Sequence, residues 1–502
     1  MATNNKKNAR DTMQPSFIPA GLAPALCLSI AALTGCSSDT TGGDGSSGSN
    51  FPDNAKFISA DGDITIAIKT AFITAQSGDY LVLPEGRLQI TDTLTLDGDP
   101  DGDGASLENI TIAGYGMDKT ILDFSGSLGG DGIFIQNMKD VTVRNLAVEE
   151  AANNGIKLKD SDGIRLQYTR TEWKGALTSD NGAYGLYPVE CSNILIEDSY
   201  VRGSADAGVY VGQSSNIVVR RNVAKENVAG IEIENSQNAD VYNNVAEGNT
   251  GGILVFDLPI GNHKYGSTVR VFNNIIRDNN TDNFANASSN PAGVHIVPPG
   301  TGVIVLSTAD VEVYNNAISN HDTTSVTVSS FFIAASQTEM EQYVMDDIMA
   351  DGWRSVPRNI SIHDNSISDS GGNPRGDLIQ GVLPAFQAIG ETTLPSVLYD
   401  GFGELLARAG YGATFSEEPF AADGSENICV VNNGDATKGF LYNPDPTTFT
   451  DADPADGEPD ATTGVGANLL DCDLARLPAA SATVAGKVYG CGQDDAHAAC
   501  SL

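Results

Sequence analysis

The chain has 502 residues and a formal net charge of -37, which comes from 65 acidic and 28 basic residues. This excess of negative charge excludes nucleic acid and anionic lipid surfaces as general partners, because both would be repelled. The length would allow two or three domains, unless an internal repeat organises the chain.

Residues 1–35 are predicted to be a signal peptide. A basic start is followed by an interrupted apolar stretch at 17–33, which is too short to span a membrane. The run from Leu33 to Cys36 resembles the lipobox of bacterial lipoproteins and implies cleavage before Cys36 and lipidation there; an ordinary secretion signal is the alternative. Ser37 resembles an outer-membrane sorting residue. Residues 36–50 are rich in Ser and Gly and predict a flexible tether.

A repeat organises residues 51–433. Short apolar alternations, each opened by glycine, recur about every 22–23 residues between insertions, at Gly132, Gly155, Gly185, Gly208, Gly230, Gly252 and Gly293. A period of this length marks an array whose units bury their apolar sides only against their neighbours.

The repeat predicts an all-β fold. Its runs alternate with period two, as strands do, and turn residues separate them. Three such strands and three turns fill one coil of a parallel β-helix. Pairs of small polar residues, such as Asn243-Asn244 and Asn273-Asn274, fit tight turns and can form an amide ladder along the stack. A leucine-rich repeat is the main rival, but its leucine consensus is missing.

Two features are expected in the first coils. Residues 65–75 predict a short capping helix over the open end of the array, with Ile66, Phe72 and Ile73 as its apolar surface. An acidic loop then spaces carboxylates as a calcium-binding loop does, with a backbone carbonyl of Asp103 and a bidentate Glu108 completing the set. A solvated acidic turn is the alternative. The predicted Ca²⁺ ligands are Asp97, Asp99, Asp101, Asp103 and Glu108.

Insertions interrupt the coils at 168–184, 258–291, 319–358 and 366–426, with helical spacing at 337–349 and 402–409. Because the strands stack, insertions at equivalent turns emerge on one side and would wall a groove. Residues 434–502 are expected to be irregular.

Export permits two disulfides among Cys429, Cys472, Cys491 and Cys500, and their pairing stays open. Cys191 instead aligns with Ser214 in the next coil and is interpreted as a small turn residue.

The outward residues of the first strands form a row of aromatic and ionisable side chains. An extended sugar chain can use rings as platforms and charged groups as hydrogen-bonding partners; an ordinary exposed strand face is the alternative. The row comprises Phe134, Lys157, Tyr187, Tyr210, Glu232, Leu254 and His295, and Lys159, Glu234 and Phe256 lie two residues further along. Trp173, in the first insertion, is also expected to bind substrate.

Residues 57–433 resemble the pectin-lyase-like family of right-handed parallel β-helices, on stretches such as 184–190, 208–213 and 252–259. More narrowly the chain is similar to bacterial β-helix repeat proteins of unassigned function, related to alginate C5-epimerases and nitrous-oxide-reductase accessory proteins. The epimerase motif Tyr-Gly-x-Asp-Pro-His-Asp is matched at Tyr184, Gly185 and Pro188. It fails where Tyr187, Val189 and Glu190 stand.

Lyase or epimerase chemistry needs a base and a charge-neutralising group beside a sugar carboxylate. The candidate bases are Lys157, Tyr187, Tyr210, His263 and His295, and the candidate neutralisers are Arg202 and Lys225. Whether the protein is an enzyme stays open.

We therefore expect a monomeric, lipid-anchored protein of the cell envelope, on either side of the outer membrane. It would bind or process a polysaccharide, of uronate type, without an organic cofactor and with the lipid anchor as its only membrane contact. The alternatives are a noncatalytic envelope scaffold or binding protein, and a periplasmic accessory factor for metal assembly.

Overall fold

The computed structural model describes residues 51–259, 265–286, 293–333, 353–402, 426–443, 463–496 and 500. The chain divides into two compact units, residues 1–51 and 52–502, and every element described below lies in the second. Cys36, His263 and the expected helix at 337–349 lie outside the described residues, as do the tether, residues 36–50, and all but the first residue of the expected helix at 402–409. In the part that is described, no helix is long and apolar enough to cross a membrane.

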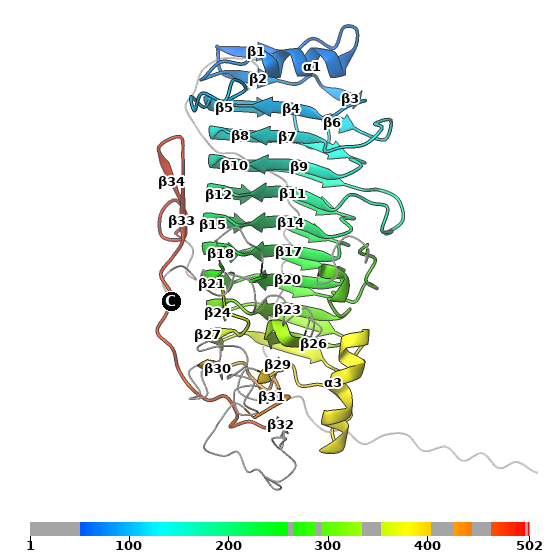
Figure 1. Cartoon of the computed structure of the whole chain (residues 1–502), viewed down its shortest axis with the longest axis vertical. Helices are drawn as coiled ribbons and strands as arrows, with labels where there is room; N and C mark the ends of the chain where they lie inside the picture. Colours follow the sequence, from blue (N-terminus) through cyan, green and yellow to red (C-terminus); the bar gives the residue numbers. More distant parts are fainter. Residues whose placement is uncertain are drawn as a thin grey trace, which may run out of the picture. The chain divides into compact units, whose positions relative to one another are not determined.

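The second unit is a parallel β-helix whose coils each contribute one strand to a front sheet and two to a back sheet (Figure 1). All front-sheet neighbours pair in parallel except the last two. The twelve front strands are β4 (Leu94–Asp97), β7 (Ile133–Gln136), β9 (Asn154–Lys159), β11 (Tyr184–Val189), β14 (Ala207–Gly212), β17 (Ala229–Glu234), β20 (Gly251–Phe256), β23 (Thr301–Leu306), β26 (Thr324–Ser329), β29 (Val397–Tyr399), β31 (Lys438–Phe440) and β32 (Gly464–Val465).

The back sheet contains two rows of strands, joined because β8 and β10 run through both rows. Its twenty strands are β1 (Ala55–Phe57), β2 (Tyr80–Val82), β3 (Gly86–Gln89), β5 (Glu108–Ala113), β6 (Thr120–Asp123), β8 (Lys139–Glu149), β10 (Asp162–Glu172), β12 (Ser192–Glu197), β13 (Tyr200–Arg202), β15 (Ser215–Arg220), β16 (Val223–Lys225), β18 (Gln237–Tyr242), β19 (Val245–Glu247), β21 (Ser267–Phe272), β22 (Ile275–Arg277), β24 (Ala309–Tyr314), β25 (Ala317–His321), β27 (Arg358–His363), β28 (Ser366–Ser370) and β30 (Ile428–Val431).

The core runs between the sheets and follows the predicted alternation. On β17, Ile231 and Ile233 point inward and are 0% and 1% exposed, while Glu232 and Glu234 point outward. Six of the seven predicted glycines open front strands, but the prediction for Gly293 is wrong. Gly293 precedes the short helix η1 (Val294–Ile296), and the coil resumes at β23. Pro298 and Pro299 follow η1 and lack the N–H that a strand ladder needs.

An asparagine ladder closes the turn between the two rows of the back sheet, as predicted. Asn244 donates from Nδ2 to Oδ1 of Asn274 at 3.0 Å, and its backbone N–H donates to the same atom at 2.9 Å. The preceding residue, Asn243, has φ +56°, which asparagine tolerates well. The ladder contains Asn222, Asn244, Asn274, Asn316, Asn365 and Asn433. A second ladder, which was not predicted, contains Asn227, Asn249, Asn279 and His321.

The capping helix α1 (Ile64–Ile73) begins where Asp63 accepts a hydrogen bond from the N–H of Ile66. Its predicted apolar face is partly wrong. Ile66 and Ile73 are 63% and 80% exposed, whereas Ile68 and Phe72, one helical turn apart, pack into the core.

The predicted insertion boundaries need correction. Strand β10 extends to residue 172, so the first insertion is 173–183; the second divides into 257–266 and 278–300 around β21 and β22. The third is 330–357, with η2 (Phe331–Ile333) in its described part, and the fourth divides into 371–396, with helix α3 (Asp377–Ala388), and 400–427. Strands β26 and β28 were missed because Thr and Ser occupy many of their positions and dilute the apolar alternation.

The C-terminal segment is not irregular throughout, contrary to prediction. Strands β33 (Ser481–Val484) and β34 (Lys487–Gly490) form a hairpin beside the back sheet (Figure 1). There Ala482, Val484 and Tyr489 pack in one cluster with outward residues of β12, β15 and β18. Two disulfides form in this region, as expected, and the structure gives their pairing as Cys429–Cys472 and Cys491–Cys500. Cys191 lies buried in a turn, where its N–H donates to Ser214.

The register of β17 makes a prediction. Ile231→Asp buries a charge without a partner and should destabilise the unit by at least about 4 kcal/mol, seen as a large fall in melting temperature. Ile275→Asp is the matched control, since Ile275 is 45% exposed and should tolerate the change. Equal melting temperatures for the two variants would contradict the register.

Candidate functional site

The outward face of the front sheet is flanked by insertions along both edges. Those at 257–266, 330–357 and 400–427 leave from the ends of front strands, and those at 173–183, 278–300 and 371–396 return to their starts. The groove was predicted with walls on one side. Insertions in fact occur at both of the turns that join the two sheets.

The outward row expected from the sequence is present, with one replacement. Phe134 pairs in register with Lys157, Lys157 with Tyr187, and further along the sheet Tyr210 with Glu232. Ile304 takes the place expected for His295, because β23 rather than η1 continues the sheet.

The row is not uniformly exposed. Phe134, Lys157 and Tyr187 are half-buried, and the Lys157 ammonium lies 5.5 Å and 5.2 Å from the ring centroids of Phe134 and Tyr187. Tyr210 and Glu232 are 4% and 1% exposed under the neighbouring loops. The half-buried end is therefore the more accessible part of the row.

A cavity of about 450 Å³ lies over strands β11 to β20. Three of the four carboxyl groups in its lining, those of Asp206, Glu232 and Glu234, are buried or half-buried. We call it the acidic cavity; its lining also includes Asn153, Asp180, Asn181, Tyr184, Phe256, Leu258, Val294 and His295. His295 thus lies near the predicted site, but it arrives there from η1 rather than from a strand.

Glu234 is held by two donors. The Tyr210 hydroxyl donates to its Oε1 at 2.8 Å, and the Gln213 amide donates to the same oxygen at 3.0 Å. Glu232 lies two residues before Glu234 on the same face of β17 and lines the same cavity, so two ionised carboxyl groups there would repel each other. The donors on Glu234 favour its ionised form, so the proton is favoured on Glu232.

Burial raises the pKa of all three carboxyl groups, and repulsion between them adds to the increase for Glu232 and Asp206. Burial raises the pKa of Glu232 well above its usual range, and the charges of Asp206 and Glu234 raise it further. Burial and the charge of Glu234 raise the pKa of Asp206 to about 7, against a hydrogen bond from Tyr184. Burial also raises the pKa of Tyr184, Tyr187 and Tyr210, so these phenols stay protonated near neutral pH.

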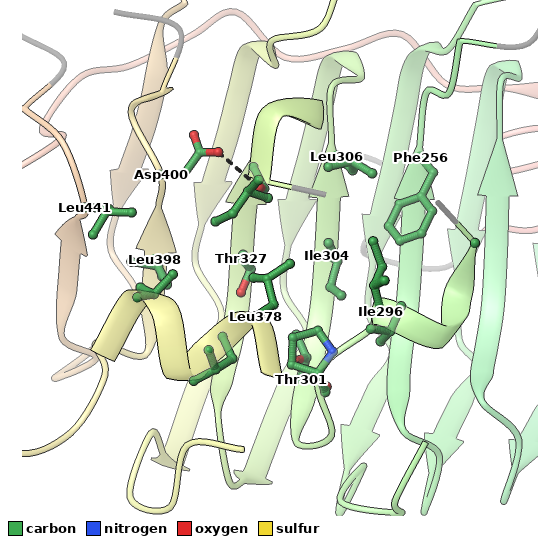
Figure 2. Close-up of a pocket in the computed structure, with 17 residues that line it drawn as sticks. Phe256, Ile296, Thr301, Ile304, Leu306, Thr327, Leu378, Leu398, Asp400 and Leu441 are labelled. Carbon is green, nitrogen blue, oxygen red and sulfur yellow. Dashed lines mark hydrogen bonds between the residues drawn. The ribbon is translucent and has the colours of Figure 1, made fainter. Parts of the chain in front are cut away.

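An apolar cavity adjoins the acidic one and shares Phe256 and Gly293 with it. Figure 2 shows outward residues of β23, β26 and β29, among them Ile304, Thr327 and Leu398, facing side chains of α3 and η1. Its main polar group, the Asp400 carboxyl, accepts hydrogen bonds from Ser329 and Ser330. The front face therefore changes from ionic and aromatic to apolar along the helix.

Other predicted residues lie elsewhere. Trp173, expected to contact substrate, is 4% exposed and donates from its indole N–H to Ala151 within the core. Arg202 pairs with Glu226, and Lys225 with Glu247, on the back sheet, so neither neutralises charge in the acidic cavity. Asp206 was missed because it lies just before β14, outside the positions that repeat from coil to coil. In the sequence, only its place as an acidic residue two positions before Gly208 could have indicated it.

The predicted calcium loop joins β4 to β5. The Asp97 carboxylate accepts hydrogen bonds from the side chains of Gln136 and Asn137, and Asp99 accepts from the N–H groups of Asp103 and Gly104. The Glu108 carboxylate Oε2 lies 3.6 Å from the Lys139 Nζ. Among the described residues no group of three or more His, Cys, Asp or Glu side chains is arranged to hold a metal ion. Calcium binding stays a prediction.

Comparisons with known proteins agree with the fold. Residues 131–298 match the family model described as right handed beta helix region. The A-module of a mannuronan C-5 epimerase from Azotobacter vinelandii is 16% identical, with 67% of this chain and 86% of that chain covered and a TM-score of 0.40. A polygalacturonase from Erwinia carotovora ssp. carotovora is 14% identical, with 65% and 97% covered and a TM-score of 0.41.

A search of curated proteins by sequence gives no match. The described part of the chain is a right-handed parallel β-helix, as the sequence predicted. The family match agrees with this fold and carries no activity.

The calcium loop can be tested directly. If Ca²⁺ binds, about a hundredfold excess over the dissociation constant should stabilise the metal-stripped protein by about 2.7 kcal/mol, while Mg²⁺ substitutes poorly. Calorimetry and thermal melting measure both effects, with Asp99→Asn/Asp101→Asn as the control. No calcium heat at millimolar ion, or equal heat in the control, would reduce the loop to a plain acidic turn.

Proposed function

We propose that the protein binds and processes a polysaccharide along the front sheet, between β7 and β20. The observation that carries this proposal is the acidic cavity, which places three carboxyl groups beside a row of aromatic rings. Tyr184, Tyr187 and Tyr210 lie with ring centroids 4.4 to 5.0 Å apart. Rings offer flat apolar platforms for sugars, and carboxyl groups with raised pKa values suit proton transfer.

The polymer is proposed to be of uronate type because of Lys157. No ion pair engages its ammonium among the described residues, and it lies over two rings at the accessible end of the row. A sugar carboxylate there would gain a charge-assisted hydrogen bond. The acidic cavity itself would repel such a carboxylate. Uronate recognition is therefore assigned to the Lys157 end.

The principal alternative is a noncatalytic envelope binding protein, which the half-buried row of Phe134, Lys157 and Tyr187 would serve by itself. Nothing among the described residues favours a role in metal assembly. Turnover separates the enzyme from the binder.

Glycan binding should depend on Lys157. Lys157→Ala should weaken the binding of uronate oligosaccharides about tenfold or more, because a charged hydrogen bond is lost. It should change the binding of neutral oligosaccharides little. Tyr187→Ala should weaken both classes through loss of the ring platform. Titration calorimetry with matched uronate and neutral oligomers measures the difference. Lys225→Ala, on the back sheet, is the control, and equal affinity in Lys157→Ala would remove the uronate assignment.

Tyr210→Ala is a poor probe of binding. The ring is 4% exposed and its hydroxyl holds Glu234, so truncation should destabilise the fold.

We also propose that the protein is exported and anchored to the outer membrane through lipid on Cys36. Cys36→Ala should release it from membrane fractions into the soluble fraction, because the acyl chains supply the anchoring energy. Fractionation of cells expressing both forms measures this. A variant that still sediments with lipid would contradict the lipobox interpretation.

A further inference from the structure

We propose that the acidic cavity is a hydrolytic centre for glycosidic bonds, in which Glu232 gives a proton to the leaving oxygen and Asp206 takes one from water. This inference rests on the proposed function and names its reaction class. It differs from the lyase or epimerase chemistry expected from the sequence.

The first argument is the position of Glu232. Its side chain is 1% exposed and lines the cavity, and its Oε2 has no hydrogen-bond partner within the described residues. A buried polar atom without a partner costs about 1–3 kcal/mol. That cost is removed if a ligand hydroxyl or glycosidic oxygen fills the cavity and meets this atom.

The second argument is the division of labour among the carboxyl groups. Glu234 is fixed by Tyr210 and Gln213, is favoured as the ionised partner, and keeps the proton on Glu232. Asp206 is half-buried and lines the cavity, so water in the cavity can reach its carboxyl group. One protonated carboxyl and one ionisable carboxyl in a single cavity are the pair that glycoside hydrolysis requires.

The balanced step follows. The bond between the anomeric carbon and the glycosidic oxygen breaks, and the oxygen leaves with the proton of Glu232. A water molecule attacks the anomeric carbon and loses a proton to Asp206, which returns it through solvent to Glu232. Because water attacks directly, the anomeric carbon should be inverted.

The cavity suits β-elimination poorly. Elimination must stabilise negative charge that develops beside a sugar carboxylate, which calls for a cation. The ionisable side chains of the lining are three buried or half-buried carboxyl groups, a fourth carboxyl group on Asp180, the imidazole of His295 and the Tyr184 phenol. The described lining contains no Lys or Arg. Burial raises the pKa of Tyr184 and Tyr210, so the phenolate that would act as the base is scarcely populated near neutral pH.

The test uses the full chain with reducing-end-labelled oligosaccharides, both of uronate type (galacturonate, mannuronate) and neutral (β-1,4- and α-1,3-glucan). Wild-type protein should release new reducing ends without the absorbance of unsaturated uronates. Glu232→Gln should lower kcat about a hundredfold or more while binding stays within about threefold of wild type. Glu247→Gln, which lies on the back sheet and pairs with Arg277, should keep full activity.

The base is tested separately. Asp206→Asn should lose activity and regain part of it with azide, which attacks without giving up a proton. In wild type, kcat should rise through about pH 7 as Asp206 ionises and fall at higher pH as Glu232 loses its proton. A limb lost in Asp180→Asn or His295→Gln, at two further titratable positions of the lining, would overturn the assignment of the limbs to Asp206 and Glu232. Proton NMR of the first product should show inversion.

The outcomes separate two claims. Binding without new reducing ends, unsaturated products, or full activity in Glu232→Gln would each overturn the hydrolytic assignment while glycan binding stands. Retained configuration would overturn the direct attack of water and the role of Asp206 as its base. No binding to any member of the panel would overturn the proposed function itself.

Discussion

Stacking of one coil on the next is the constraint on which the rest of the structure depends. A coil cannot bury its apolar side chains within itself, so each residue must match the residues at the same position in the coils before and after it. Ile231 lies between Val209 and Ile253, and Asn244 lies between Asn222 and Asn274. The same constraint aligns outward residues into rows, and it therefore creates a continuous functional face from a local repeat.

The loops decide what that face can do. On an open strand face, Glu232 and Glu234 would be solvated and would ionise like ordinary surface acids. The insertions around β14 to β20 bury them instead, and burial is the largest cause of their raised pKa values. Burying these carboxyl groups costs hydration free energy. The continuous apolar core below the cavity stabilises the fold enough to offset that cost. The cavity thus combines a rigid floor with an environment that favours protonated carboxyl groups.

The sequence predicted the repeated part well and the single parts poorly. The inward register of β17, the asparagine turns and the row from Phe134 to Glu232 follow from periodicity, which stacking enforces. The failures involve features that occur once. The motif at Gly293 matches the repeat pattern but is followed by Pro298-Pro299, and Trp173 has an exposed-loop sequence context although its ring reaches the core. Asp206 joins Glu232 only through the path of the loops, and no spacing along the chain encodes that contact.

The central claim is that the ligand of this protein lies on the front sheet over the acidic cavity. A crystal structure of the Glu232→Gln variant with a bound oligosaccharide tests it most directly. The account predicts sugar density that crosses Tyr187 and enters the cavity, with one ring within hydrogen-bond distance of Asp206. An oligosaccharide bound on the back sheet, or one confined to the loops outside the cavity, would contradict it.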